Sequence, residues 1–231
     1  MTDTTKARYE EHKIKSHRFT VPRFSVIIPA YNSAEYIERG LKSIAMQSFS
    51  NYELIIVCDS CTDNTTQIAR KYADHVYEVN YHQDGQTRNF GLSKATGEYV
   101  LWMDDDDWFL HEYVFEMLDS VIGRNDEDVL FFDFIWRGKG YAHQTRDQIF
   151  IACWCKCFRR EFITDCRFSD EKYISDVAFH KAVLSKKPRA VFWNMPLYYY
   201  NFMRKGSMSR ELKDMGVMYG EVDYKDIDKE V

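Results

Sequence analysis

Between residues 24 and 136, short apolar runs rich in β-branched residues alternate with longer segments of mixed polarity. Runs of this kind, apolar at nearly every position, are typical of strands that are buried on both faces of a parallel sheet. They occupy residues 24–30, 52–58, 75–80, 98–103 and 128–136. We therefore predict that these five runs are strands of one sheet.

The segments between the runs place apolar residues three or four apart, and several open on Ser, Asp or Gly, as helices do. They span residues 33–47, 63–73, 85–95 and 110–122. Strands that alternate with helices predict an α/β fold with a Rossmann-like, mostly parallel sheet flanked by helices. Ligands of such sheets bind beyond the carboxyl ends of the strands.

The chain after about residue 140 is less regular. It offers a strand candidate, a helix candidate and an apolar extended segment, at residues 148–158, 175–186 and 190–202. We predict one globular domain with a polar arm before it and a tail after it. The expected boundaries are 1–22 for the arm, 23–108 for the ligand-binding half, 109–210 for the second half, and 211–231 for the tail.

Composition narrows the classes of partner. With 231 residues, of which 45% are hydrophobic, the chain can bury a sizeable core. Its formal net charge of −5 gives no broad cationic surface of the kind that nucleic-acid binders use. No apolar run is long enough to cross a bilayer, and the start lacks the apolar core of a signal peptide. We expect a cytoplasmic chain whose basic arm is able to touch an anionic membrane surface.

Six cysteines raise the alternatives of a zinc site or a redox pair, since Cys58 and Cys61 have CxxC spacing. Three others alternate with single residues, which predicts one face of a strand and small apolar packing. We expect reduced, buried, structural thiols, with the zinc and redox readings as alternatives. The six are Cys58, Cys61, Cys153, Cys155, Cys157 and Cys166.

The strongest chemical signal is the aspartate run 104–107, directly after the apolar run 98–103. Four adjacent carboxylates repel one another unless a cation neutralises them, and oxygen ligands suit Mg²⁺ or Mn²⁺. The alternative is a solvated acidic turn in which Asp107 caps the next helix. A phosphatase of the haloacid type fits less well, because Asp107 and Trp108 stand where it needs a small β-branched residue.

Two further strand ends carry candidate ligand contacts. Asp59 ends the second run, where a carboxylate can accept the imide N–H of uracil and exclude cytosine. Asp63 is more typical of a helix N-cap. Tyr31 follows the first run and is suited either to stacking on a nucleobase or to the core. The absence of G-x-G-x-x-G at this turn argues against a dinucleotide site.

These motifs together resemble the family-2 glycosyltransferases of the GT-A fold. The resemblance runs from about residue 24 to residue 209 in the order and spacing of the family. It rests on VIIPAYN, the spaced Gln47 and Ser48, CDSCTDNT, TRNFGLSKATGEYVLWMDDDDW, WCKCFRREF and YISDVAF.

The resemblance implies a nucleotide site and a metal site at matching positions. Asp106 is implied as the metal ligand with help from Asp104, and Mn²⁺ or Mg²⁺ as the cofactor. Tyr31 matches the residue on the uracil ring, Asp59 the residue on its imide, and Arg88 the nucleotide-site arginine. The implied nucleotide-binding residues are Pro29, Tyr31, Asp59, Arg88, Asp104 and Asp105.

Asp176 matches the catalytic base of the family, although on its own it would read as a helix cap. Two departures affect other positions. The family's glutamate before the base is Ser175 here, and its Asp-Asp-Gly-Ser motif is CDSC, which has lost the glycine. Near the end of the domain, Arg204, Lys205 and Ser207 are placed to reach the donor diphosphate.

The implied activity is inverting, metal-assisted transfer from a nucleotide sugar, expected to be a UDP-sugar, to an acceptor hydroxyl. A surface glycan or glycolipid is the expected acceptor, and a hydroxymethylated DNA base is the less favoured one, because the net charge does not suit it. Two alternatives stay open. They are a nucleotidyltransferase that makes nucleotide sugars, although PAYNSAEY lacks its glycine-rich basic loop, and a non-catalytic binding module.

Overall fold

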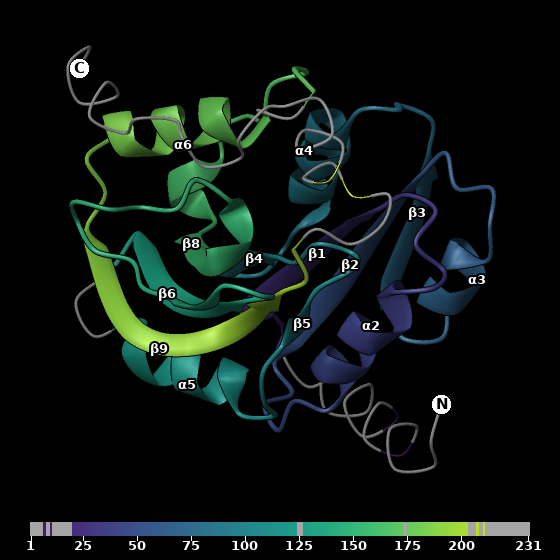
Figure 1. Cartoon of the computed structure of the whole chain (residues 1–231), viewed down its shortest axis with the longest axis horizontal. Helices are drawn as coiled ribbons and strands as arrows, with labels where there is room; N and C mark the ends of the chain where they lie inside the picture. The colour runs from purple at the N-terminus through teal and green to yellow at the C-terminus, as the bar shows by residue number, and fades with distance from the viewer. Residues whose placement is uncertain are drawn as a thin grey trace.

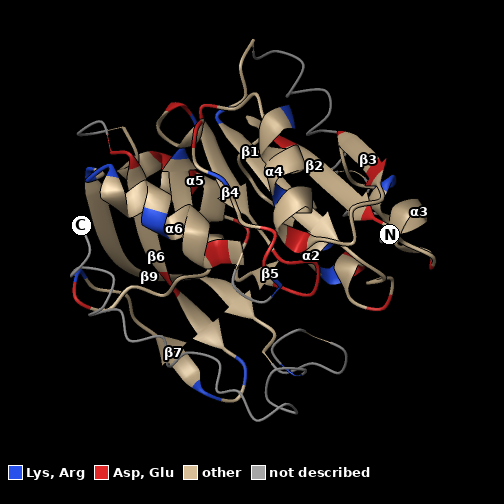
Figure 2. Cartoon of the chain, turned by 90° about the horizontal axis from the view of Figure 1, so that it is seen from above, with Lys and Arg blue, Asp and Glu red and all other residues tan. Residues whose placement is uncertain are grey.

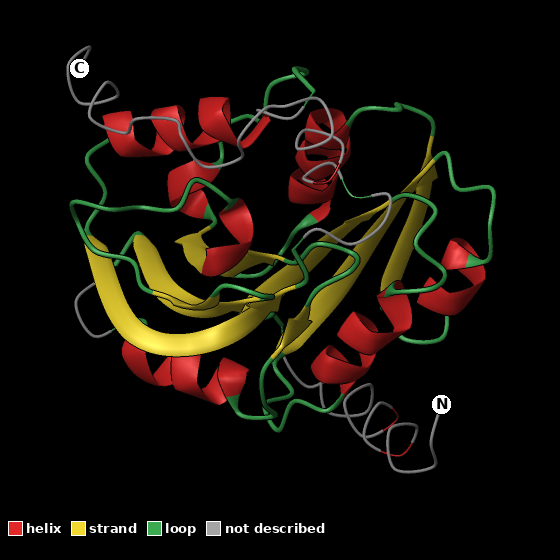
Figure 3. Ribbon diagram, viewed as in Figure 1, coloured by secondary structure: helices red, strands yellow, loops and turns green. Residues whose placement is uncertain are grey.

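The computed structural model describes residues 20–123, 127–172 and 175–202, with single residues at 7, 10, 207 and 210. Within these residues the chain forms one nine-stranded sheet covered by helices on both faces (Figures 1 and 3). The predicted α/β domain with a Rossmann-like sheet is confirmed. No helix in the described part is both long and apolar enough to cross a membrane.

The first half of the sheet is parallel, as its apolar runs predict. Its strands lie in the order β3-β2-β1-β4, with β1 at the centre. Residues of β1 are hydrogen-bonded in register to β2 on one side and to β4 on the other. The strands are β1 (Phe24–Ala30), β2 (Tyr52–Asp59), β3 (His75–Val79) and β4 (Tyr99–Trp102).

Two apolar cores lie between the sheet and its helices, one on each face of the sheet. One core joins the sheet to α2, α3 and α5, and the other joins the opposite face to α4 and α6. Figure 1 shows α2 and α5 on one side of the curved sheet, and α4 and α6 on the other. The helices are α2 (Ile37–Ala45), α3 (Thr65–Ala69), α4 (Asp84–Lys94), α5 (Val114–Val121) and α6 (Ser175–Ser185).

The second half continues the sheet with mixed strand directions. From β4 the order runs β4-β8-β6-β9-β5, and β7 pairs with β6. β9 is long, curves along β6 and is parallel to it with an irregular register. The strands are β5 (Trp108–Phe109), β6 (Val129–Trp136), β7 (Gly140–Ala142), β8 (Lys156–Arg159) and β9 (Ala190–Tyr200).

The strand predicted over residues 148–158 is wrong for most of its length. Cys153–Cys155 forms a 3-10 turn, η1, and only the last part of the segment enters β8. The turn brings Trp154 parallel to the Tyr198 ring at 4.7 Å, which a continuous strand would not do. The cysteines are still buried, except for Cys61, which is half-buried.

The carboxyl ends of β1, β2 and β4 meet where the candidate residues gather. β4 ends at Trp102, which pairs with Ile27, so β1 runs on past its neighbour. Pro29 therefore lies beyond the end of that ladder, where its missing N–H breaks no hydrogen bond to β4. In Figure 2, acidic segments lie near the centre of the view, between α4, α6 and β5.

Candidate active site

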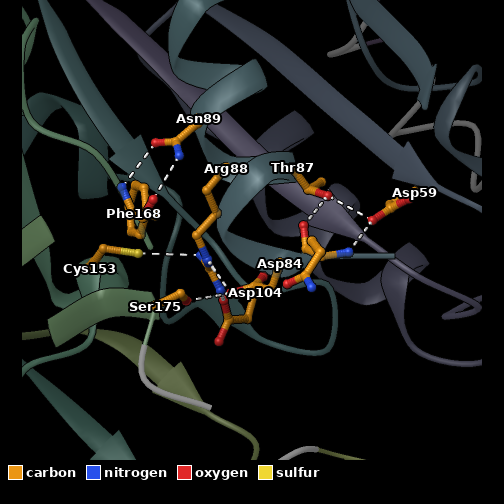
Figure 4. Close-up of polar contacts among 10 residues, drawn as sticks. Asp59, Asp84, Thr87, Arg88, Asn89, Asp104, Cys153, Phe168 and Ser175 are labelled. Carbon is orange, nitrogen blue, oxygen red and sulfur yellow. Dashed lines mark hydrogen bonds and ion pairs between the residues drawn. The ribbon is translucent and has the colours of Figure 1, made fainter. Parts of the chain in front are cut away.

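Arg88 is the centre of a buried charge network (Figure 4). It lies in α4 and is 4% exposed. Its Nε donates to Asp84 Oδ2 and its Nη2 to Asp104 Oδ1, both at 2.9 Å, while Nη1 lies 3.3 Å from Cys153 Sγ. Burial alone lowers the pKa of Arg88, but the adjacent negative charges raise it well above its usual value. The guanidinium therefore remains charged and holds Asp104 in place.

Gly85 allows the segment before α6 to lie against the start of α4. A methyl group at this position would meet Ser169 O at 1.9 Å, which no relaxation of a side chain relieves. The close approach lets Ser175 Oγ donate to Asp84 Oδ2 at 3.0 Å. Ser175, at the position where the family resemblance implies a glutamate, thus joins the first turn of α6 to the Arg88 network. The next residue is Asp176.

Asp176 is a carboxylate enclosed by this network. Its Oδ1 is buried, and no hydrogen-bond partner reaches it among the described residues. Burial raises the pKa of Asp176 to about 6, with Asp84 and Asp104 adding to the rise and Arg88 opposing it. A carboxylate of this kind is ionised at neutral pH yet basic enough to accept a proton. The geometry is suited to the predicted role of general base, which stays a prediction.

Two further buried groups surround Asp176. Lys156 is 0% exposed, and its Nζ donates to Ala152 O at 2.7 Å and to Phe150 O. Burial lowers the pKa of this lysine. His180, one turn along α6, lies with Nδ1 3.2 Å from Asp176 O, and burial lowers its pKa well below the usual value. The histidine is therefore neutral, and Arg88 and Lys156 provide the positive charge near Asp176.

The aspartate run divides into two parts. Asp104, Asp105 and Asp106 are half-buried, whereas Asp107 is 0% exposed. The alternative reading of Asp107 as a helix cap is wrong, because it accepts hydrogen bonds from Tyr198 Oη and Asn201 N, both at 2.7 Å. Burial and the charges of Asp106 and Asp104 raise its pKa well above the usual range. Asp107 therefore anchors the end of β9 to the loop.

Tyr31 and Asp105 connect the loops after β1 and β4. Tyr31 N donates to Asp105 Oδ2 at 3.0 Å. The Tyr31 side chain is 57% exposed, so its ring is accessible at the carboxyl end of the sheet rather than in the core. Of the two interpretations of Tyr31, the structure favours an accessible surface residue, as stacking on a nucleobase requires.

Asp59 is 5% exposed and organises the loop that leads into α4. Its two oxygens accept hydrogen bonds from Ser60 Oγ, Tyr81 N, His82 N, Gln83 N and Thr87 Oγ1, at 2.8 to 3.0 Å. Burial raises the pKa of Asp59, and these hydrogen bonds lower it below the usual value. The contact with uracil remains a prediction, since these five donors already occupy the carboxylate.

Ser60 stands at the glycine position of the second motif and has a backbone conformation that suits glycine. Ser60 has φ +55°, in the left-handed region that glycine adopts easily. Its hydroxyl donates to Asp59 Oδ1 at 2.9 Å, which helps to hold this conformation, and its oxygen also lies 2.8 Å from Asn80 Oδ1. Asp63 accepts from Thr65 N at 2.9 Å, but the N-cap of α3 is Asn64, so the predicted N-cap is wrong by one residue.

The remaining diphosphate candidates lie at the end of the domain. Arg204 and Lys205 are outside the described residues. Ser207 accepts a hydrogen bond from Arg210 N at 3.2 Å, and its contact with a diphosphate remains a prediction.

Sequence reasoning missed several residues of this site. Asp84 had a usable signal, since it stands four residues before Arg88 and directly before the predicted helix 85–95. Tyr198 and Lys156 had none, because their roles depend on contacts between strands far apart in the chain. Tyr198 Oη also accepts from Asp104 N at 3.0 Å.

Comparison with known sequences shows which family the chain belongs to. The pattern of "Glycosyl transferase family 2" matches residues 25–191, which is most of the chain and runs from β1 through α6. This chain belongs to glycosyl transferase family 2. The recognition made from the motifs is confirmed.

Two characterised relatives within family 2 are larger than this chain. GlyA, a glycosyltransferase of Streptococcus pneumoniae, is 26% identical over 221 residues, which cover 81% of this chain and 32% of GlyA. TarS of Staphylococcus aureus, a poly(ribitol-phosphate) β-N-acetylglucosaminyltransferase, is 37% identical over 116 residues, which cover 47% of this chain and 20% of TarS. The chain thus spans about a third or less of these relatives.

Two solved glycosyltransferase structures share the fold. TarS residues 1–349 in complex with UDP-GlcNAc superpose with a TM-score of 0.69 at 26% identity, over 81% of this chain and 60% of that one. A mannosyltransferase of Pyrobaculum calidifontis in complex with GDP-Man and Mn²⁺ gives a TM-score of 0.67 at 18% identity, over 91% and 69%. The second likeness supports the fold alone.

Proposed function

We propose that this family-2 chain transfers a sugar from a UDP-sugar to an acceptor hydroxyl, with inversion at the anomeric carbon. The observation that carries the proposal is Asp176, a half-buried residue whose Oδ1 is buried and whose carboxyl has a pKa of about 6, near the Arg88–Asp104 ion pair. Family membership supports sugar transfer. The TarS structures in complex with UDP and UDP-GlcNAc support a uridine donor.

The donor is proposed to lie over the carboxyl ends of β1, β2 and β4. The exposed Tyr31 ring would stack on the base, with Pro29 beneath it and Asp105 fixing the Tyr31 backbone. Asp59 shapes the loop beside the base. Asp105, the middle residue of the D-x-D region, would face the ribose of the nucleotide, and Arg88 holds the neighbouring Asp104 in place.

A divalent cation fits this loop. No three His, Cys, Asp or Glu side chains in the described ranges converge on one point, and a Mg²⁺ or Mn²⁺ site of one or two carboxylates needs no such cluster, because substrate phosphates and water complete it. The donors available are the half-buried carboxylates of Asp106 and Asp104. When bound there, the cation would supply Lewis-acid stabilisation of the leaving diphosphate.

The protein's own groups would then move one proton. Asp176 accepts the proton of the acceptor hydroxyl while the oxygen of that hydroxyl forms a bond to the anomeric carbon. The bond from that carbon to the diphosphate oxygen breaks, and the electron pair leaves with UDP. Arg88 and Lys156 favour the ionised form of Asp176, which keeps the base ready near neutral pH.

A surface glycan or glycolipid is the proposed acceptor. The name of TarS specifies transfer to poly(ribitol-phosphate), a phosphate-linked polymer, which supports a polymeric acceptor of this kind. The family match over residues 25–191 favours sugar transfer over the synthesis of nucleotide sugars.

Calorimetric titration with UDP, CDP and GDP, each with Mn²⁺ and with EDTA, tests the donor assignment. We expect metal-dependent preference for UDP in the parent and its loss in Asp106→Ala. Asp147→Asn, which replaces an exposed acid elsewhere, is the matched control. Failure of the parent to bind any of the three nucleotides would contradict the proposal and favour a non-catalytic module.

Transfer from UDP-GlcNAc tests the base separately. Asp176→Asn is expected to bind UDP as the parent does and to lose transfer by a factor of about 100 or more. Equal loss of UDP binding would count against its role as base.

A further inference from the structure

The β6–β7 hairpin holds a buried carboxylate that the proposed reaction does not use. Asp133 in β6 is 1% exposed. It accepts hydrogen bonds from the Tyr141 hydroxyl and from Gln144 N at 2.9 Å, and its Oδ2 lies 2.8 Å from His143 Nδ1. Burying a carboxylate is unfavourable by several kcal/mol unless such partners offset it. A buried acid with this set of donors therefore fixes the side chains around it.

Two of those side chains are aromatic rings at the surface. Tyr141 is 53% exposed, and the side chain of His143 is 41% exposed. Their rings lie nearly parallel, with centroids 6.3 Å apart and an interplanar angle of 15°. Both are bound to the same oxygen, Asp133 Oδ2. The hairpin thus presents two aligned, accessible rings whose rotamers are held from below.

The hydrogen bond to Asp133 also determines which ring nitrogen of His143 is left to accept a hydrogen bond. In the neutral imidazole, Nδ1 carries the proton that it donates to the carboxylate, which makes Nε2 a hydrogen-bond acceptor. The Tyr141 and His143 faces are electron-rich, and they attract the partially positive C–H groups of a flat apolar surface. An ordered platform of this kind binds with little loss of side-chain entropy.

A pyranose ring matches this chemistry. One of its faces is formed by C–H groups, which pack on aromatic rings, and its rim carries hydroxyls, one of which can donate to His143 Nε2. Peptides and lipids lack this combination of a flat C–H face and a hydroxyl rim.

The Tyr141–His143 pair lies on the same face of the sheet as Lys156, one of the charges near Asp176. Phe131 and Asp133, two residues apart in β6, point to the same face. On that face, Lys156 Nζ lies 5.3 Å from the centre of the Phe131 ring, and Lys156 is one of the charges that act on Asp176. The step from Phe131 to Asp133 is about 7 Å along the strand. Figure 2 shows β7 at the edge of the molecule, away from β1, β2 and β3.

We infer that Tyr141 and His143 form a binding platform for a pyranose ring of the acceptor. The inference rests on the proposed function, because the sugar held there belongs to the molecule that receives the transferred residue. The inference names a substrate class, namely an acceptor that already contains a sugar ring. It also places an acceptor subsite at the β6–β7 hairpin, away from the proposed donor site.

Nuclear magnetic resonance of histidine-labelled protein tests the platform directly. The probes are chitotriose, cellobiose and methyl β-D-galactopyranoside, with adenosine for comparison, and the His143 signals are assigned by their loss in His143→Gln. We expect at least one sugar to shift these signals. No shift with any of the three sugars, or a shift with adenosine alone, would overturn the inference.

Matched variants separate ring stacking from folding. Tyr141→Ala is expected to weaken binding of that sugar about five- to tenfold, whereas Tyr141→Phe keeps the ring and stays within about twofold of the parent. Tyr113→Ala removes a tyrosine with similar exposure, 51%, at the start of α5, and should bind as the parent does. Equal weakening by Tyr141→Phe and Tyr141→Ala would show that stacking is not the source of affinity.

UDP calorimetry on the same samples separates this inference from the proposed function. Loss of the sugar-induced shift in Tyr141→Ala, with UDP binding as in the parent, supports the platform. A parent that binds UDP and shows no sugar-induced shift refutes the platform and leaves the function standing. A parent that shifts with sugar and does not bind UDP refutes the function alone.

Discussion

Arg88 Nη2 lies 2.9 Å from Asp104 Oδ1 and joins the interior of α4 to the loop after β4. The same guanidinium binds Asp84 in the first turn of its own helix. Because Arg88 is 4% exposed, both contacts are made away from bulk water, where charges interact more strongly. The position of the aspartate loop therefore depends on a buried cation from a different part of the chain.

Replacement of this cation should damage folding and donor binding together. Arg88→Met leaves Asp84 and Asp104 without their partner, and we expect a loss of about 3 to 5 kcal/mol in the free energy of unfolding. Arg88→Lys keeps the charge but cannot donate to both acids in the same way, so its loss should be smaller. Urea unfolding measures both; equal stability of Arg88→Met and the parent would contradict the network.

Asp176 should make the protein less stable at neutral pH than at pH 4. Its pKa is about 6 in the folded chain and about 3.9 in an unfolded one, so its effect on stability disappears only below both values, at about pH 3. Between these values the folded state binds more protons, so stability falls as pH rises and then levels off above pH 6. Asp176→Asn has no charge to bury, and we expect it to be more stable than the parent by about 2 kcal/mol at pH 7.

Urea unfolding of the parent and Asp176→Asn across this pH range checks the sign. The difference should shrink as pH falls and vanish at about pH 3, where Asp176 is protonated in the folded chain and in nearly all unfolded chains. Transfer by the parent should follow the opposite course, since the base must be ionised, and should fall about tenfold per pH unit below 6. A variant that is less stable than the parent at pH 7 would contradict the assigned pKa.

Asp59 should have the opposite effect on acid stability. Its hydrogen bonds hold its pKa below the usual value, so the stability that it contributes is present above about pH 4 and is lost as pH falls further. Asp59→Asn should lose about 2 kcal/mol at pH 7, and less at pH 3. Thr87→Val removes one of the five donors and should lose about 1 kcal/mol. Chemical unfolding at both pH values distinguishes them.

Tyr198 connects two aspartates through one hydroxyl. Its Oη donates to Asp107 Oδ2 at 2.7 Å and accepts from Asp104 N at 3.0 Å. Tyr198→Phe leaves both groups unsatisfied in a buried place, and we expect a loss of about 2 to 3 kcal/mol with weaker metal-dependent UDP binding. Tyr199→Phe, the neighbouring residue whose ring stacks on Trp108, is the control and should change stability by less than about 0.5 kcal/mol.

The sequence was most informative where one local pattern was sufficient. The apolar runs gave the strands of the parallel half to within one or two residues. Of these strands, β1, β2 and β4 are buried on both faces, and β3 at the edge of the sheet is partly exposed. The helices were found by spacing and are shorter than predicted at their ends. The aspartate run and Asp176 stand out by residue type and position alone.

The second half shows why the remainder could not be read from the chain. Cys153 and Cys155 have the alternation of a strand but lie in a turn, since Lys156 binds the carbonyl oxygens before it and buries its own ammonium. Such a contact depends on the three-dimensional fold. The pairing of Asp107 with Tyr198 likewise joins residues 91 positions apart, which no local spacing predicts.

Gly85 sets the distance between the donor half and the base. An added Cβ would lie 1.9 Å from Ser169 O and 3.3 Å from Ser175 Cβ, so Gly85→Ala must push the start of α6 away from α4. Ser175 would lose its hydrogen bond to Asp84, and Asp176 would move relative to Asp104. We therefore expect transfer to fall by a factor of about 100, since a shift of about 1 Å has an effect of this size.

The matched control is Ser93→Ala, an exposed substitution in the same helix. It should leave transfer and UDP binding as in the parent. UDP binding by Gly85→Ala should decrease much less than transfer, because Tyr31 and Asp105 lie on loops that the substitution does not touch. If Gly85→Ala transferred sugar at the parent rate, the spacing of α4 and α6 would not matter for the reaction, and Asp176 would have to act from somewhere other than its place beside Arg88.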